Sequence, residues 1–428
     1  MSLYRNAIAN WTVVPWRVRS GIERWVESSA RQRLPALYRL LHCGRTANPV
    51  RPVTFGPKHH FFGYYDKTPW NASGSLLLAH EAAFNDRPPS ADDPVIVGVV
   101  RLQQECRFEP LATVATWNWQ QGSMLQWHPT DSESVFVHND CRAGRFVGIV
   151  RDTSARELRV YERPLYAIAP DGRSAYSLNF ARLQRHRPGY GYLGAEDEFE
   201  QVLAPERDGI FHVDLHSGRS TLIVSLAQLA AFEPRSKMAD WHHWVNHIQV
   251  SRGGRRIAFF HLWRSGGGGW SVRLFTANAD GSGLKCEVDS GVVSHYDWLD
   301  DNRLLVWADA VARGGHFLLV DCDTGDRRIV GEGELVEDGH CSFSPDCRWI
   351  LNDTYPDRFD MRTLMLYRFP GGPRIDIARL HSPKSRWWGE VRCDLHPRWD
   401  RSGRSVCIDS VHDGTRQMYV ADVGGMVR

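Results

Sequence analysis

The sequence lacks several features that would place it in familiar classes of protein. It contains no run of 18 or more apolar residues, so a membrane-spanning helix is not expected. Its 428 residues carry 52 lysines and arginines against 50 aspartates and glutamates, and this near balance argues against a nucleic-acid-binding protein that needs a large basic field. The nine cysteines are odd in number and have no paired spacing, which favours reduced thiols over a disulfide framework.

The N-terminal segment also lacks the pattern of a secretory signal. Its apolar run is broken by Arg17, Arg19, Glu23 and Arg24, and no small-residue cleavage site follows a continuous apolar core. We therefore expect a cytoplasmic protein. Residues 1–47 carry eight arginines against two glutamates, with apolar residues near helical spacing. They predict a basic amphipathic helical extension that either packs on the rest of the protein or lies on anionic lipid, peripherally at the inner membrane.

Helical periodicity is missing from the rest of the chain, where short strands and tight turns recur. The stretch from Gly339 to Asp353, GHCSFSPDCRWILND, has the pattern of a strand, a proline-set turn and a second strand. Seven turns of this kind each separate two short apolar runs, at residues 71–74, 129–131, 170–172, 251–254, 299–301, 345–346 and 399–403. Most copies continue into a third and a fourth strand. Four short strands per roughly 40 to 60 residues are typical of propeller blades.

The last copy is one strand short of a blade, because the chain ends soon after Met418 to Val423. The segment from Pro49 to Phe55, before the first copy, is strand-like and can supply the missing strand. We therefore predict an all-β fold. It is a seven-bladed β-propeller over residues 48–428, closed by its N- and C-terminal strands, with an N-terminal α-helical extension. Such closure removes exposed sheet edges.

Histidines gather near the innermost strands of the predicted ring. Five of them lie at nearly the same point of five copies: His128, His247, His295, His340 and His396. Ring closure would bring these side chains to the axis at one mouth. Neutral imidazoles and a thiolate suit zinc, manganese or another divalent transition metal. We expect such a metal at His247, His340, Cys393 and His396, although inner-strand histidines can also simply hydrogen-bond a neighbouring blade.

Two polar segments interrupt the regular pattern. The segment between Tyr176 and Asp208 is too long for a blade turn and is rich in arginine, which recognises carboxylates through two parallel hydrogen bonds. It favours an acidic ligand over a merely solvated loop. The segment KHHFFGYYDKTPWN, from Lys58 to Asn71, offers histidines and tyrosines for proton transfer or for hydrogen bonds between blades. The substrate-binding residues expected from these segments and from the fourth copy are His60, Tyr65, Arg182, Arg187, His243 and Arg264.

Several motifs resemble those of propeller polysaccharide lyases, namely the ulvan lyases and, more distantly, the oligogalacturonate lyases. The motifs are QWHP, FVHND, RPGYGY, PERDG, DGHCSFSPD and RCDLHPRWD, between Lys58 and Val423. Related rhamnosyl-glucuronate glycosidases share the scaffold. The resemblance implies β-elimination at a uronic acid. It assigns proton transfer to His128 and to Tyr190 or Tyr192, and neutralisation of the uronate to His138 and Arg207.

The sequence also departs from these lyases. They are exported, and the metal site of oligogalacturonate lyases, three histidines and one glutamine, has no position-by-position match. The sequence is therefore as consistent with a bacterial protein that makes or trims a surface exopolysaccharide as with one that breaks down an extracellular polysaccharide. The expected partner is an acidic oligo- or polysaccharide, and no nucleic acid. Two other functions stay open: a glycoside hydrolase or transferase that uses the His59 and His60 face, and a non-catalytic propeller scaffold.

Overall fold

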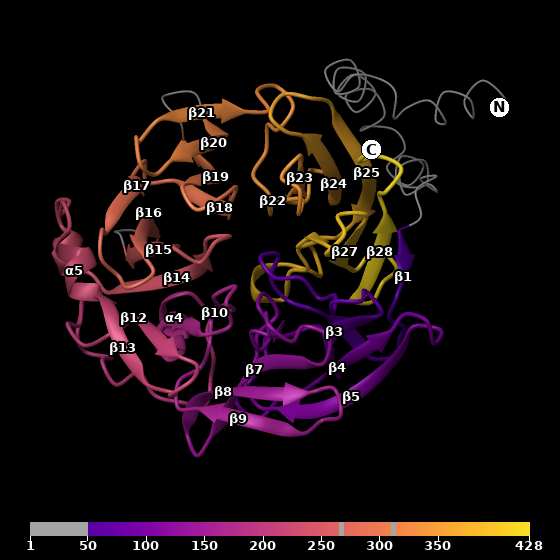
Figure 1. Cartoon of the computed structure of the whole chain (residues 1–428), viewed down its shortest axis with the longest axis horizontal. Coiled ribbons are helices and arrows are strands. Elements are labelled where there is room, and N and C mark those ends of the chain that lie inside the picture. Colours follow the sequence, from indigo (N-terminus) through magenta and orange to yellow (C-terminus); the bar gives the residue numbers. More distant parts are fainter. Residues whose placement is uncertain (1–49, 265–268, 310–313) are drawn as a thin grey trace.

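The structure is a computed structural model that describes residues 50–264, 269–309 and 314–428 (Figure 1). The basic extension predicted for residues 1–47 lies outside the described residues. Within the described part of the chain, no helix is long and apolar enough to cross a membrane.

Seven four-stranded antiparallel sheets stand around a central axis, which confirms the prediction of a seven-bladed β-propeller (Figure 1). The strands of blades 1 to 3, from the axis outwards, are β2 (His59–Phe61), β3 (Leu76–Ala82), β4 (Val95–Arg101) and β5 (Arg107–Val114); β6 (Gln126–Trp127), β7 (Val135–Arg142), β8 (Arg145–Asp152) and β9 (Glu157–Tyr161); and β10 (Ala167–Ile168), β11 (Ser174–Ser177), β12 (Gly209–Asp214) and β13 (Ser220–Ser225).

The remaining blades follow the same plan. Blades 4 to 6 contain β14 (His243–Val250), β15 (Arg256–Arg264), β16 (Trp270–Asn278) and β17 (Lys285–Val288); β18 (Val293–Trp298), β19 (Arg303–Asp309), β20 (Gly315–Asp321) and β21 (Arg327–Val330); and β22 (Ser342–Phe343), β23 (Trp349–Asn352), β24 (Met361–Arg368) and β25 (Arg374–His381). Blade 7 contains β26 (Arg398–Trp399), β27 (Ser405–Ser410), β28 (Gln417–Asp422) and, outermost, β1 (Arg51–Pro52).

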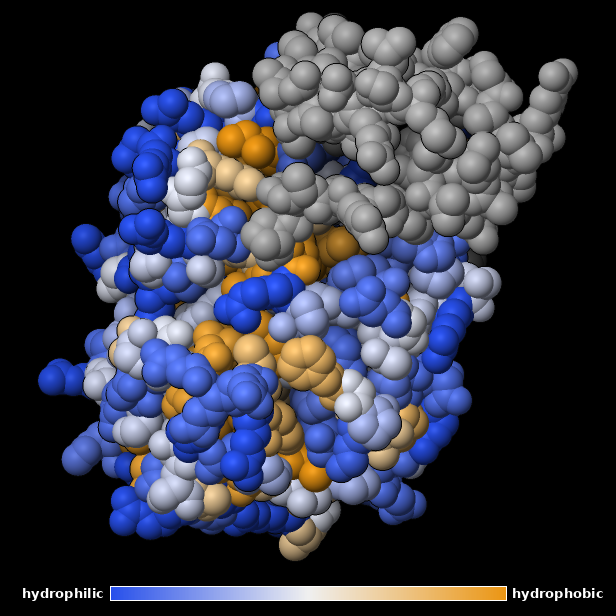
Figure 2. Space-filling view, turned by 90° about the vertical axis from the view of Figure 1, so that its right-hand side faces the viewer, coloured by the Kyte–Doolittle hydropathy of each residue, from blue (hydrophilic) through white to orange (hydrophobic). Residues whose placement is uncertain are grey.

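The ring closes in blade 7, where both ends of the propeller meet. The strand β1 pairs antiparallel with β28, placing Arg51 opposite Val420 and Pro52 opposite Tyr419. A proline is tolerated there because β1 is an outer edge strand with a free N–H side. Figure 2 shows the side of the ring that carries β25, β28 and β1, where hydrophobic residues form a band between hydrophilic surfaces.

All seven turns singled out in the sequence join the first strand of a blade to its second. In blade 6 the turn is closed by side chains, because Ser344 Oγ donates to Asp346 at 2.6 Å and the Trp349 N–H donates to Ser344 Oγ at 3.0 Å. The strands that follow are buried on both faces between neighbouring blades, as Leu77, Leu78 and Ala79 of β3 illustrate. This two-sided burial explains the short continuous apolar runs after each turn.

The described residues also contain two short α-helices. The helix α4 (Phe180–His186) belongs to the long insertion of blade 3 and begins at Asn179, whose side chain accepts the Arg182 N–H. The helix α5 (Leu226–Ala231) follows β13 and begins with a capping box between Ser225 and Gln228. Two single turns of 3₁₀-helix are η2 (Met238–Asp240) and η4 (Gly389–Val391).

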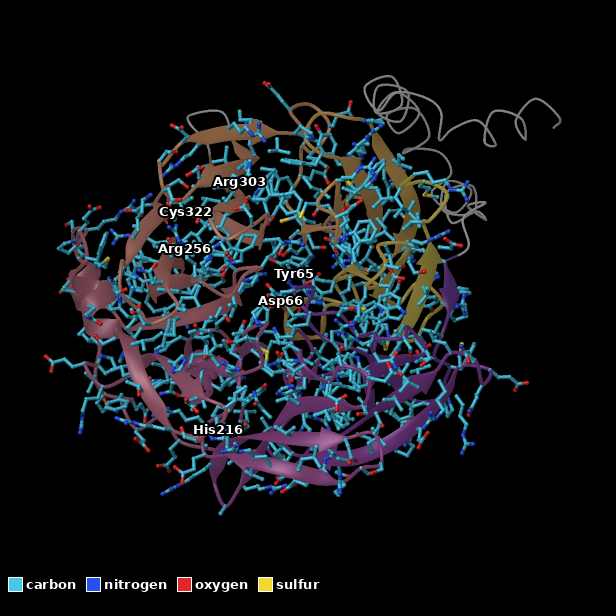
Figure 3. All side chains as sticks on the ribbon, in the orientation of Figure 1. Tyr65, Asp66, His216, Arg256, Arg303 and Cys322 are labelled. Atoms are coloured by element: carbon cyan, nitrogen blue, oxygen red, sulfur yellow. The ribbon has the colours of Figure 1, made fainter. Side chains whose placement is uncertain are left out.

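The innermost strands are irregular near the axis. The register of β14 shifts between Asn246 and Gln249, where His247 has a φ of 64°, and that of β18 shifts between Val293 and Tyr296. In blade 1, residues 62–69 separate β2 from the isolated bridge between Trp70 and Leu77. Figure 3 shows Tyr65 and Asp66 of this segment near the centre of the ring. Bulges of this kind redirect side chains, and here they direct them toward the axis.

Candidate functional site

Four histidines from four different blades meet at the axis. His247 lies in β14, His295 lies in β18, His340 precedes β22 and His396 precedes β26. The ring centroids of His295 and His340 are 4.1 Å apart, and those of His340 and His396 are 4.4 Å apart. All four side chains are buried. Together with Tyr64 and Tyr65, these histidines form what we call the axial cluster.

The prediction that His128 joins the other four histidines is wrong. His128 directly follows β6, and its Nδ1 lies 3.1 Å from Thr130 Oγ1 within the turn to β7. The other four histidines stand three to five residues before their own turns, whereas His128 stands one residue before its turn. Because each strand residue advances about 3.3 Å, this offset places His128 at the opposite end of the innermost strand.

Tyr64 and Tyr65 both hydrogen-bond His247. The Tyr64 hydroxyl lies 3.2 Å from Nδ1, and the Tyr65 hydroxyl lies 3.1 Å from Nε2. Tyr65 donates its single proton to the carbonyl oxygen of Tyr296 at 2.9 Å. The arrangement that satisfies every group therefore has Nε2 donating to Tyr65 and Tyr64 donating to Nδ1. With both nitrogens engaged, His247 serves as a bridge between two tyrosines.

Burial sets the protonation of this trio. It raises the pKa of Tyr64 and of Tyr65 well above the ordinary value. It lowers the pKa of His247 well below the ordinary value, and the neighbouring His295 and Lys67 act in the same direction. All three groups are thus neutral near pH 7. A hydrogen bond already joins the Tyr64 hydroxyl to Nδ1, but burial disfavours the charged pair that proton transfer along it would create.

His340, Asp394 and His396 form a candidate metal site. One ligand atom from each residue lies within 4.8 Å of the other two, and all three residues are buried. Asp353 accepts from His340 Nδ1 at 2.8 Å, which fixes the tautomer and leaves the Nε2 lone pair free. The Nε2 atoms of His340 and His396 are buried and have no hydrogen-bond partner among the described residues. A cation bound between the two rings would give both nitrogens a partner.

The candidate ligands have the protonation states that metal binding requires, and two arginines pair with the Asp394 carboxylate. Burial lowers the pKa of His340, although Asp353 opposes the change, and it lowers the pKa of His396 further. Burial alone would raise the pKa of Asp394, but Arg392 at 2.7 Å and Arg362 at 2.6 Å hold it well below the usual range. Two neutral imidazoles and one carboxylate fit a divalent transition metal, and three protein ligands leave coordination positions open.

A layer of side chains lies between the axial cluster and solvent. The Tyr190 hydroxyl accepts from Arg392 Nη2 at 2.5 Å, and the Tyr190 ring meets the Tyr64 ring edge to face at 6.2 Å. The Tyr355 ring lies 5.8 Å from His340 and is 37% exposed. Tyr355 is the exposed residue of this group, and we call the surface around it the mouth.

Cys393 does not lie with the histidines. Its thiol packs in a small apolar group with Trp387 and Val411, and burial raises the pKa of this thiol to about 11. The neighbouring Asp394 takes the position expected for Cys393, because successive side chains of an extended segment point to opposite sides.

The insertion of blade 3 brings one of its two tyrosines to the axis. Tyr190 reaches the axial cluster, whereas Tyr192 stacks on Phe180 with ring centroids 4.3 Å apart. Arg182 is buried and donates to backbone carbonyls, including that of His243 at 2.6 Å. Arg207 is exposed and lies over the Phe199 ring. The insertion is therefore largely self-supporting, and Tyr190 and Arg187 are its members nearest the mouth.

The other expected site residues have partners away from the axial cluster. The neighbours are Asn139 and Phe136 for His138, Gln417 and Glu81 for His60, His261 and Met238 for His243, and His186 and Trp244 for Arg264. Burial lowers the pKa of His138 to about 4. These contacts join strands or neighbouring segments.

Sequence reasoning missed several residues of the site. Asp353 is the last residue of the hairpin motif GHCSFSPDCRWILND, and Asp394 lies inside RCDLHPRW next to Cys393. Tyr64 stands next to Tyr65 in the doubled GYYD motif. In each case the sequence shows the motif. Which of two adjacent side chains faces the axis depends on the local backbone conformation, which the sequence does not show.

Comparison with known proteins shows the fold. No family model and no curated protein matches this chain. The chain is similar to the crystal structure of oligogalacturonate lyase from Vibrio parahaemolyticus, with 13% identity, a TM-score of 0.65, and coverage of 90% of this chain and 96% of that one. It is also similar to an oligogalacturonate lyase in complex with manganese, with 16% identity, a TM-score of 0.65, and coverage of 89% and 94%. The chain therefore has the propeller fold of these proteins over nearly their whole length.

Proposed function

We propose that the protein is a metal-dependent lyase that cleaves an acidic oligo- or polysaccharide by β-elimination at a uronic acid. One observation carries the proposal. The candidate metal site of His340, Asp394 and His396 lies beside the neutral trio of Tyr64, His247 and Tyr65, so a cation and a proton-transfer chain share one mouth. The fold shared with oligogalacturonate lyases, one of them in complex with manganese, supports it.

The chemistry requires charge neutralisation before proton removal. When bound, a manganese or zinc ion would bind the uronate carboxylate and stabilise the negative charge that develops beside it. The Tyr64 hydroxyl donates to His247 Nδ1, so passing its proton to that nitrogen makes Tyr64 Oη a base. Burial opposes the charges that this transfer creates. A cation held by His340 and His396, whose rings lie 6.2 and 5.0 Å from the Tyr64 ring, would offset this by stabilising the Tyr64 phenolate. This oxygen takes the proton from the carbon next to the carboxylate.

The leaving group needs a proton, and Tyr190 can provide it. Its hydroxyl oxygen accepts from Arg392, and its own proton has no acceptor among the described residues. As the double bond of the product forms, the carbon–oxygen bond breaks and the departing oxygen takes the Tyr190 proton. The products are a 4,5-unsaturated uronic acid and a shortened saccharide. This scheme gives Tyr190 the role that the sequence resemblance implied for it.

The test is a product assay on a panel of uronate-containing oligosaccharides, with the purified protein loaded with manganese or zinc. We expect stoichiometric metal and an unsaturated product that absorbs in the ultraviolet. Mass spectrometry gives a second readout, because hydrolysis adds a water and elimination does not. New reducing ends with added water would replace the lyase by a glycoside hydrolase. No turnover together with no bound metal would leave a non-catalytic scaffold.

The source of the substrate is part of the proposal. An acidic surface exopolysaccharide of a bacterium fits both the chemistry of the site and the basic N-terminal segment, which would hold the protein at the inner membrane. Screening such polymers alongside oligogalacturonates therefore belongs in the panel.

A further inference from the structure

We propose that Arg187, Trp270 and Tyr190 form a second sugar subsite, which binds the carboxylate of the acidic unit next to the one that reacts. The inference rests on the proposed function, because it names a further part of the same substrate. It predicts that the protein distinguishes a chain of consecutive acidic sugars from a chain in which only one unit is acidic.

Two aromatic rings hold the Arg187 guanidinium in place. Its central carbon lies 4.2 Å from the centroid of the Trp270 ring and 4.9 Å from that of the Tyr190 ring. Stacking on two rings restricts the side chain before any ligand arrives. A group ordered in advance loses less conformational entropy on binding.

The charge of Arg187 is unmatched within the described part of the chain. Its guanidinium has no carboxylate within ion-pair distance and donates no hydrogen bond to a described group. The neighbouring Arg182 and Arg185 differ, because both lie within 4 Å of the Asp197 carboxylate. No described residue takes up the guanidinium N–H groups of Arg187, so a carboxylate of a ligand can accept from them. A half-buried cation without a partner is unfavourable, and a carboxylate from a ligand corrects this.

This cation stands next to the reacting groups. The Tyr190 ring that contacts Arg187 also lies 5.7 Å from the Arg392 guanidinium and 6.2 Å from the Tyr64 ring. Arg392 in turn pairs with Asp394 of the candidate metal site. One aromatic ring thus separates Arg187 from the axial cluster, so a saccharide whose carboxylate reaches the metal would extend its neighbouring unit toward Arg187.

Trp270 supplies the second half of the subsite. Trp270 is the first residue of β16, and its side chain is 41% exposed. Most other tryptophans of the described residues are buried. The exposed part of such a ring offers apolar surface to the apolar face of a sugar ring. Arg187 would then read the carboxylate while Trp270 supports the ring.

The experiment is calorimetric titration of the full-length, manganese-loaded protein with digalacturonate, trigalacturonate and a trigalacturonate that keeps one free carboxylate and carries methyl esters on the other two. We expect the wild-type protein to bind the fully acidic trimer most tightly. Arg187→Gln should weaken that binding about 10- to 100-fold and leave binding of the trimer with one free carboxylate unchanged. Arg187→Lys should retain only part of the wild-type affinity, because lysine keeps the positive charge but lacks the two parallel N–H donors of the guanidinium. Arg219→Gln is the control, since Arg219 belongs to the same blade and is exposed in the turn between β12 and β13.

Two results separate this inference from the proposed function. If the wild-type protein binds and cleaves acidic oligomers and Arg187→Gln binds them equally well, the subsite is wrong and the lyase stands. If the wild-type protein binds none of the acidic saccharides, the uronate substrate itself is wrong. Far-ultraviolet circular dichroism and the unfolding midpoint of each variant show that the fold is intact, which Arg187→Gln should preserve because it breaks no hydrogen bond to a described residue.

Discussion

Asp409 and Arg398 form a buried ion pair beneath the segment that carries Tyr64, with 2.8 Å between Oδ2 and Nη2. The Asp409 carboxylate also accepts from the backbone N–H groups of Phe62 at 3.2 Å and Gly63 at 3.4 Å. Arg398 donates to the carbonyl oxygens of Gly63 and Tyr64. Blade 7 thus holds the part of blade 1 that fills the axis, so this pair belongs to the support of the proposed site.

Removing one partner of this pair should strongly destabilise the protein. We expect Asp409→Ala to lower the free energy of unfolding by about 3 to 5 kcal/mol, because it leaves a buried guanidinium and two backbone donors unmatched. Denaturant unfolding monitored by circular dichroism measures this change. Arg156→Ala is the control, since Arg156 is 73% exposed in its pair with Asp152 and should cost at most about 1 kcal/mol. Equal effects of the two substitutions would contradict the supporting role of the buried pair.

Substitutions at Cys393 and Asp394 should show which of these adjacent residues is the metal ligand. We expect Asp394→Ala to remove most bound manganese or zinc, whereas Cys393→Ser should retain it because the thiol faces Trp387 and Val411. Asp353→Asn should weaken metal binding about 10- to 100-fold, since Asp353 orients His340 without touching the metal. Equilibrium dialysis with elemental analysis measures the bound metal. Loss of metal in Cys393→Ser with full retention in Asp394→Ala would reverse the assignment.

The fold could be predicted because its signals are local. Each hairpin is encoded by neighbouring residues, as in the turn from Ser344 to Asp346 and the apolar runs beside it. The number of such hairpins predicts the seven blades. The sequence could also indicate that histidines of distant copies converge, since equivalent positions of repeated blades are equivalent in space. His247, His295, His340 and His396 behave in this way.

The details of the site depended on distortions that have no local signal. The register shifts in β14 and β18 and the excursion of residues 62–69 decide which side chains face the axis. A shift of one residue exchanges the two faces of an extended segment, as at Cys393 and Asp394. The prediction for His128 was wrong for a related reason. Its position along the innermost strand, and not only its presence in that strand, decides which end of the ring its side chain reaches.

Gly339 should not tolerate a side chain. A methyl group there would overlap the carbonyl oxygen of Asp353, whose carboxylate orients His340. We expect Gly339→Ala to lower the free energy of unfolding by about 1 to 3 kcal/mol and to weaken metal binding. Gly371→Ala is the control, because a methyl group at that turn meets nothing within 4 Å. Thermal unfolding and metal titration of both variants test this, and equal behaviour of the two would show that the backbone beside His340 adjusts freely.

The stability of the protein should depend on the protonation of His138. Burial lowers the pKa of this imidazole to about 4, whereas an unfolded chain has a value of about 6.5. Between these values the unfolded state binds more protons, so the contribution of His138 to stability is complete above pH 6.5 and is lost as the pH falls toward 4. From pH 7.5 to pH 4.5 the loss amounts to about 2.5 kcal/mol.

Comparison with His138→Gln isolates this contribution, because other groups act equally in both proteins. One such group is Asp297, whose pKa burial raises to about 6 and which therefore favours the folded state at low pH. We expect the variant to lose about 2.5 kcal/mol less than the wild type when urea unfolding is repeated at pH 7.5 and pH 4.5. His216→Gln, at an exposed position, should keep the wild-type pH dependence. If His138→Gln also has the wild-type pH dependence, burial does not hold the His138 imidazole neutral, and this imidazole must accept a proton within the folded protein.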